Sequence, residues 1–262
     1  MRCLYREIKY KCGDYLEIDL FPVFEYQRGR NKKRKPTSEI QKRLNQKNAE
    51  RKLIRLLNTN FNEKDIRFDL TYRDDKNPIS PEEAQKELQN FLRRVKRYRN
   101  KNNLSDLRYV AVTEIGEKKG RVHHHIIMSG DINISKLAKI WGRGYTTAKP
   151  LQFDNFGIAG IAKYLIKNPV LKKRWSASRN LKKPKTSKRD GRLPQYKVEE
   201  FGRRGNDNKN EIEKLYKGYL LAGCETYYND FNGRYYLTIR MYEDPKEKRK
   251  RLWRKKKKQK ER

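Results

Sequence analysis

The order of apolar patterns between residues 66 and 167 constrains the fold of this chain most strongly. Two-residue alternation of apolar and polar side chains predicts strands, and apolar side chains three or four positions apart predict helices. The pattern runs as strand 66–72, helix from Ser80, strands 108–115 and 121–128, helix 134–141, strand 145–152 and helix 155–167. The first six elements match a split β-α-β unit, ferredoxin-like or RRM-like. We therefore expect an α+β protein whose antiparallel sheet carries helices on one face.

The helix from Ser80 has the best-marked start. Ser80 and Glu83 form a capping box, and Pro81 suits the first helical turn. Apolar residues then recur at helical spacing, which predicts that this face lies in the core: Ala84, Leu88, Phe91, Leu92, Val95 and Tyr98.

Further elements are expected on both sides of this core. An N-terminal hairpin is predicted over 3–11 and 15–21, a basic helix over 38–57, and a second hairpin around Asn232-Gly233 within 223–242. The predicted organisation has four parts: 1–60 (hairpin and basic helix), 61–170 (the core), 171–245 (a basic loop and the C-terminal hairpin) and 246–262 (a basic tail, expected to be disordered or helical only on nucleic acid).

The charge of the chain indicates its class of partner. It holds 67 Lys and Arg against 32 Asp and Glu, a formal net charge of +35. Such an excess favours polyanions, of which nucleic acid is the commonest. The basic runs are Arg28–Lys35, Lys172–Arg192 and Lys246–Arg262. Each run alone is also compatible with a solubilising surface, but together they predict many phosphate contacts.

Several protein classes are not expected. There is no run of about 18 apolar residues, so a membrane span is not predicted. The N-terminal residues lack the apolar stretch of a signal peptide. The three cysteines, Cys3, Cys12 and Cys224, form no C-x-x-C pair, which is typical of a reducing cytoplasm. No P-loop motif occurs, so this chain is not expected to be a helicase.

The three histidines of the chain are adjacent, at His123, His124 and His125. On a strand, alternate side chains share a face, so His123 and His125 point the same way, with Cα atoms about 6.5–7 Å apart. If the 108–115 and 121–128 hairpin pairs Glu114 near His123, its carboxylate joins the two imidazoles. That set suits Mn²⁺ or Mg²⁺ acting on a phosphate, with Zn²⁺ as an alternative. A run of solvated or core histidines stays open at this point.

The helix over 155–167 carries a candidate nucleophile. Ile158, Ile161, Ala162 and Leu165 form its buried stripe, whereas Tyr164 and Lys167 lie on another stripe, one turn apart. Tyr164 can therefore face a cleft while its helix packs on the sheet. A tyrosine on a helix also serves for packing alone, and only its pairing with the candidate metal site argues otherwise.

These motifs resemble those of HUH endonucleases. The strand Gly120-Arg-Val-His-His-His-Ile-Ile is similar to their His-hydrophobic-His strand, although its middle residue is His. The stretch Ala-Lys-Tyr164-Leu-Ile-Lys167 resembles their Tyr-x-x-Lys helix, and Phe68-Asp-Leu-Thr-Tyr72 their first strand motif. The nearest group is the rolling-circle replication initiators of phages and plasmids, including filamentous-phage replication proteins. The resemblance covers about residues 40–185, and the order of the motifs is more specific than any single one.

The resemblance implies nicking and rejoining of single-stranded DNA at an origin or origin hairpin. Tyr164 would be the single nucleophile and form a 5′-phosphotyrosine, Lys167 would favour the phenolate or orient the phosphate, and the divalent metal would lie on His123, His125 and Glu114. A helicase and a polymerase would come from the host, and the protein would act in the cytoplasm of a bacterial cell.

Other functions remain open from the sequence. A single-tyrosine HUH transposase or relaxase would use the same site residues. A non-catalytic RRM-like nucleic-acid-binding protein would instead expose aromatic side chains on its sheet, whereas strands 66–72 and 121–128 offer Asp69, Thr71 and histidines. A structural zinc protein would lack a fourth ligand, since the cysteines lie far away in sequence.

Overall fold

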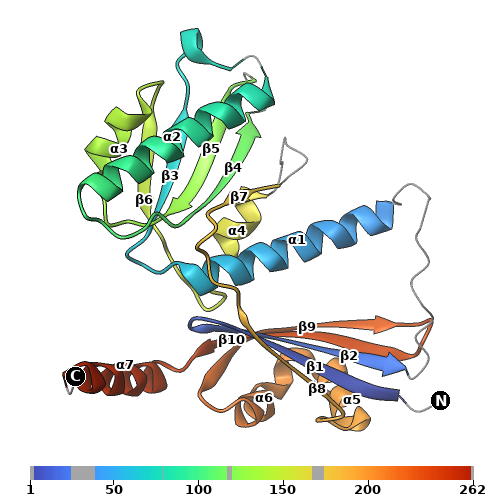
Figure 1. Cartoon of the computed structure of the whole chain (residues 1–262). Helices are drawn as coiled ribbons and strands as arrows, with labels where there is room; N and C mark the ends of the chain where they lie inside the picture. Colours follow the sequence, from blue (N-terminus) through green and yellow to red (C-terminus); the bar gives the residue numbers. More distant parts are fainter. Residues whose placement is uncertain (1–2, 25–38, 79, 117–119, 167–173, 261–262) are drawn as a thin grey trace. The chain divides into compact units, whose positions relative to one another are not determined.

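The computed structural model describes residues 3–24, 39–78, 80–116, 120–166 and 174–260 (Figure 1). The chain divides into two compact units. Unit 1 comprises residues 1–49, 154–157 and 184–262, and unit 2 comprises 50–153 and 158–183. Each unit contains a five-stranded antiparallel sheet. The expected α+β class is therefore confirmed.

Unit 2 contains the predicted core. Its sheet has the strand order β6-β3-β5-β4-β7. Without the short edge strand β7, this order is that of a ferredoxin-like split β-α-β unit. The elements are α1 (Glu39–Asn60, of which residues from Glu50 belong here), β3 (Ile66–Thr71), a 3₁₀ turn (Asp74–Lys76), α2 (Pro81–Lys101), β4 (Tyr109–Ile115), β5 (Val122–Met128), α3 (Ile134–Trp141), β6 (Thr146–Pro150), α4 (Ala159–Leu165) and β7 (Ser176–Ala177).

Helices α2 and α3 cover one face of this sheet (Figure 1). The Oγ of Ser80 accepts a hydrogen bond from the Glu83 N–H, as expected for an N-cap. Phe91 of α2 lies edge-on against Trp141 of α3, with ring centroids 5.6 Å apart. Helix α3 ends at Gly142, whose φ of 61° places it in the left-handed region that favours glycine. Core packing therefore fixes the orientation of the strands that carry the histidines.

Helix α4 is shorter than the predicted span of 155–167. Residues Asp154–Gly157 form a tight turn, in which the Asp154 carboxylate accepts a hydrogen bond from the Phe156 N–H. Asp side chains compete in this way with helix formation, so the helix begins at Ala159. Ala162 and Leu165 are buried, as the apolar stripe predicted. Lys167 lies outside the described residues.

Unit 1 joins the two terminal hairpins in one sheet, with the strand order β8-β1-β2-β10-β9. The sequence analysis had assigned these hairpins to separate segments, because nothing local in either sequence indicates their pairing. The unit contains β1 (Cys3–Cys12), β2 (Tyr15–Phe24), β8 (Lys185–Asp190), α5 (Gln195–Arg204), a 3₁₀ turn (Gly205–Asn208), α6 (Lys209–Leu215), β9 (Tyr219–Asn229), β10 (Arg234–Glu243) and α7 (Pro245–Lys260). Val198, Phe201 and Ile212 of its helices lie in the core.

Two basic segments differ from their predicted conformations. Residues 185–190, expected within a basic loop, form strand β8, which pairs with β1 and is exposed throughout. Residues 246–260, expected to be disordered, lie in α7, where Asp244 caps the first turn and Arg251 pairs with Glu243. These caps and pairs offset part of the repulsion among the lysines of the helix. The predicted basic loop Arg28–Lys35 lies outside the described residues.

Candidate active site

The face of the unit 2 sheet opposite α2 carries a group of polar side chains. In the observed register Glu114 of β4 pairs with His123 of β5, and Asp69 of β3 pairs with His125. Paired residues in adjacent strands point to the same face. Glu114, His123, His125 and Asp69 therefore share one surface, which Arg67 extends along β3. We call these five residues the polar face.

His124 lies on the other face, in the core. It is fully buried, and its two ring nitrogens are hydrogen-bonded to the Tyr72 hydroxyl (2.8 Å) and the Thr113 hydroxyl (3.0 Å). Burial, together with the charges of His125 and His123, lowers the pKa of His124 to about 3. His124 is therefore a neutral residue of the core and does not take part in the polar face.

Replacing His124 with leucine is expected to lower the free energy of unfolding by about 2–3 kcal/mol. The change leaves the buried hydroxyls of Tyr72 and Thr113 without this partner. Thr113→Val is the matched comparison: it removes only one of these contacts and should cost about 1 kcal/mol. Urea denaturation followed by circular dichroism measures both. Wild-type stability in His124→Leu would show that these hydrogen bonds contribute nothing net.

His125 is held between two carboxylates. Its Nδ1–H donates to Asp69 Oδ1 (2.7 Å), and its Nε2 lies 3.3 Å from Glu114 Oε2. Burial alone would raise the pKa of Asp69, but hydrogen bonds from His125 and Arg67 outweigh it and hold that pKa below its ordinary value. Asp69 is thus ionised, which fixes the Nδ1–H tautomer when the ring is neutral. The Nε2 lone pair then faces the Glu114 carboxylate, a contact that needs a proton or a cation.

This arrangement fits two ligands of a divalent ion. Two ligand atoms on an octahedral Mg²⁺ lie about 3 Å apart, close to the Nε2–Oε2 separation of 3.3 Å. A carboxylate on the far nitrogen, as Asp69 provides, is the usual support of a metal-binding histidine. Within the residues that the structure describes, however, no three His, Cys, Asp or Glu side chains form a complete metal site. His123 would have to turn towards the pair to complete one.

His123 is half-buried next to Gly116. Burial and the charge of His125 lower its pKa, although Glu114 acts in the opposite direction. A Cβ at Gly116 would lie 3.0 Å from the His123 Nε2, so a glycine at this position leaves the imidazole its room. The hairpin turn thus contributes to the placement of the ring.

Tyr164 of α4 lies against the polar face. Its ring centroid is 5.4 Å from that of His125, and the Arg67 guanidinium carbon lies 4.6 Å from the centre of the Tyr164 ring. The side chain is 48% exposed, so its ring borders solvent as well as the histidine. Burial of Ala162 and Leu165 on the same helix anchors α4 while Tyr164 stays accessible. The structure thus brings Tyr164, His125 and Glu114 together.

Sequence reasoning gave no specific role to Arg67 and Asp69. Arg67 binds Asp69 (2.9 Å) and is the described cation beside the Tyr164 phenol, the position expected for Lys167. Both residues alternate with the buried Phe68 and Leu70 on the strand predicted at 66–72, so the pattern did place them on the polar side. Their role depended on the adjacency of β3 and β5, which the pattern does not contain.

The fold and the polar face define an α+β protein with a histidine–carboxylate–tyrosine site on a ferredoxin-like sheet. Residues 66–169, which include this site, match the family model of replication-associated proteins that is named for ORF2 and the gene-2 protein. No curated protein matches the chain, and neither does any solved structure. The match supports a replication-initiator role. Among the described helices, none combines the length and the apolarity needed to cross a membrane.

Proposed function

We propose that unit 2 nicks and rejoins single-stranded DNA at a replication origin, with Tyr164 as the nucleophile. The observation that carries the proposal is the contact of the half-exposed Tyr164 ring with His125 on one side and Arg67 on the other. A nucleophile beside a cation and a polarised histidine is the arrangement that phosphoryl transfer requires.

In the proposed reaction, the Tyr164 oxygen forms a bond to the phosphorus as the bond from phosphorus to the 3′ oxygen breaks. The phenol loses its proton and the 3′ oxygen gains one, so the step needs no ATP and can run in reverse. Arg67 stabilises negative charge on the phenol oxygen and on the phosphate. The 3′-OH end would prime synthesis by a host polymerase, with unwinding by a host helicase.

A divalent ion, Mn²⁺ or Mg²⁺, would be held by His125, Glu114 and His123. It would neutralise and polarise the scissile phosphate. Asp69 keeps the proton on Nδ1 of His125 and so leaves Nε2 available as a ligand. Lys167 remains a proposed second cation of the site.

Incubation with a single-stranded origin library and Mn²⁺, followed by peptide mass spectrometry, tests the proposal. The expected product is a nucleotide-modified peptide that contains Tyr164. Rejoining of a circular single strand would favour replication, whereas transfer between the ends of an element would favour the transposase alternative. Modification of another tyrosine, or of none, would contradict the assignment.

Replacing Arg67 with alanine is expected to slow adduct formation about a hundredfold, because a preorganised charge beside the phenol and the phosphate is removed. Arg67→Lys keeps the charge but not the planar guanidinium, so partial activity is expected. Arg97→Ala on α2 makes the same change of charge away from the polar face. Rates are measured from covalent adduct on denaturing gels. Equal rates in Arg67→Ala and Arg97→Ala would exclude a role for Arg67.

A further inference from the structure

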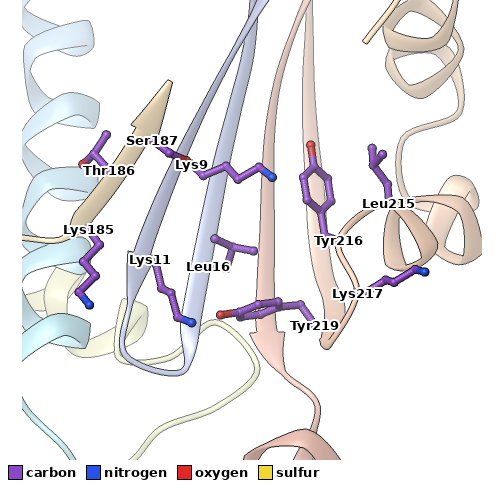
Figure 2. Close-up of a pocket in the computed structure, with 10 residues that line it drawn as sticks. All are labelled: Lys9, Lys11, Leu16, Lys185, Thr186, Ser187, Leu215, Tyr216, Lys217 and Tyr219. Carbon is purple, nitrogen blue, oxygen red and sulfur yellow. The ribbon is translucent and has the colours of Figure 1, made fainter. Parts of the chain in front are cut away.

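Unit 1 contains a basic cleft that lies outside the polar face of unit 2. Its volume is about 400 Å³, the size of a small-ligand pocket. Figure 2 shows Lys9 and Lys11 reaching from β1 towards Tyr216 and Tyr219. The cleft is lined by Lys9, Lys11, Leu16, Lys185, Thr186, Ser187, Leu215, Tyr216, Lys217 and Tyr219. Four of these ten residues are lysines and none is acidic, so an anion is the ligand that its charge favours.

Buried interactions hold one wall of the cleft. Glu7, which is 2% exposed, accepts a hydrogen bond from the Tyr216 hydroxyl (2.6 Å) and pairs with Arg192 and Lys9. The Lys9 ammonium lies 4.9 Å from the centre of the Tyr216 ring, and the Arg192 guanidinium 5.4 Å from it. Cations thus cover this ring, so it positions the lysine and is not a surface on which a base can stack. The cleft is therefore suited to phosphate more than to base recognition.

Lys11 and Lys185 are direct cross-strand partners of β1 and β8. Like charges directly opposite each other destabilise a sheet. In the described part of the chain, no ion pair with a carboxylate involves Lys11, Lys185 or Lys217. A bound anion would relieve this repulsion.

Protection of the sheet edge is a simpler explanation for lysines on β8. Outer strands often carry lysine, which prevents pairing with other chains. That explanation fits Lys188, which lies on β8 but does not line the cleft. It does not account for Lys9 and Lys11, because β1 lies between β8 and β2 inside the sheet. The concentration of lysines at the cleft thus needs another reason.

We propose that this cleft binds the sugar-phosphate backbone of single-stranded DNA, as an anchoring site separate from the nicking chemistry. The inference rests on the proposed substrate, DNA, but not on the covalent step. Lys11 and Lys185 contact phosphates, Lys9 is held in place by Glu7 and Tyr216, and Tyr219 forms the wall beneath Lys11. Binding is independent of base sequence, because the cleft presents cations and no fixed base-reading groups.

The experiment compares two variants of equal formal charge in the full-length chain. Lys11→Gln/Lys185→Gln removes two charges from the cleft, whereas Lys188→Gln/Lys209→Gln removes two exposed charges of the same unit outside it. Fluorescence anisotropy with labelled oligothymidine, without added metal, gives affinity over a salt series. Each phosphate contact on a single strand contributes about 0.7 to the salt slope. The cleft variant should therefore lose about 1.4 from the slope and about 25-fold in affinity at 0.1 M salt.

The control variant is expected to stay within twofold of wild type. Equal losses in both variants would overturn the proposal, because they would show a general effect of charge. Acetylation mapping gives a second readout in the wild-type chain: oligothymidine should protect Lys11 and Lys185 from acetic anhydride but not Lys188. Absence of this protection would also overturn it.

Competition distinguishes the sources of the anion. Thymidine monophosphate, inorganic phosphate and polyglutamate are added to the wild-type complex with oligothymidine. Weak competition by all three supports a site for a nucleic-acid strand. Competition by the mononucleotide or phosphate at concentrations near that of the oligonucleotide would point to a free phosphate compound instead. Equal competition by polyglutamate of matched charge would point to an acidic polypeptide.

The cleft and the nicking proposal can fail separately. The binding assay is repeated with Tyr164→Phe, which removes the proposed nucleophile but no lysine of the cleft. If cleft-dependent binding persists while wild type forms no adduct, the proposed function fails and the cleft stands. If wild type forms the Tyr164 adduct but both lysine variants bind alike, only the cleft proposal fails.

Discussion

Replacing Tyr164 with phenylalanine should abolish the covalent protein–DNA adduct and leave binding of the oligonucleotide within twofold of wild type. The phenol oxygen is the proposed attacking atom, and phenylalanine keeps the ring that contacts His125 and Arg67. Removal of a nucleophile removes the covalent path altogether, so no residual adduct is expected. Denaturing gels with a labelled origin oligonucleotide and Mn²⁺ measure the adduct, and anisotropy measures binding.

Tyr145→Phe is the matched control for this experiment. Tyr145 belongs to the same unit and is 71% exposed, but no described contact joins it to the polar face. Its variant should form adduct at the wild-type rate. A persistent adduct in Tyr164→Phe would place the nucleophile elsewhere, and loss in both variants would indicate that the substitutions act through the fold.

Replacing His125 with alanine should reduce metal-dependent nicking at least about a hundredfold, because the ring joins Asp69, Glu114 and Tyr164. Asp69→Asn, which alters the support of the ring but not the ligand itself, should weaken Mn²⁺ binding about 10–100-fold. Isothermal titration with Mn²⁺ separates the two effects from nicking assays.

Val112→Ala provides a comparison in the same sheet, since Val112 pairs with His125 on β4 but carries no ligand atom. It should reduce stability and leave metal affinity nearly unchanged. Unchanged Mn²⁺ affinity and nicking in His125→Ala would remove the metal site from the proposal, while the tyrosine chemistry could still be tested by the adduct.

The sequence predicted the elements of unit 2 because their signals are local. The capping box at Ser80, the apolar stripe of α2 and the stop at Gly142 each lie within a few residues of what they determine. The register of Glu114 with His123 could also be anticipated, since a short hairpin connects their strands. Alternation along β5 similarly separated His124 from its two neighbours.

Long-range pairing was beyond the same reasoning. Strand β8 is exposed on every residue and lacks the apolar alternation that marks a half-buried strand, so only its pairing with β1 makes it a strand. The role of Arg67 and Asp69 likewise depended on β3 lying beside β5, more than fifty positions away in sequence. Interactions that are set by topology leave no periodic trace in the residues themselves.

The sheet of unit 1 has a consequence for the order of events during synthesis. Strand β2 pairs with β10, so that Leu20 lies opposite Leu237. All of unit 2 is translated while the hairpin of β1 and β2 still lacks both of its neighbours, β8 and β10. Contacts of such sequence separation form late, because closing a long loop costs entropy before pairing repays it. The nascent N-terminal hairpin therefore emerges from the ribosome with two open edges, and a chaperone that shields them would raise the yield of folded protein.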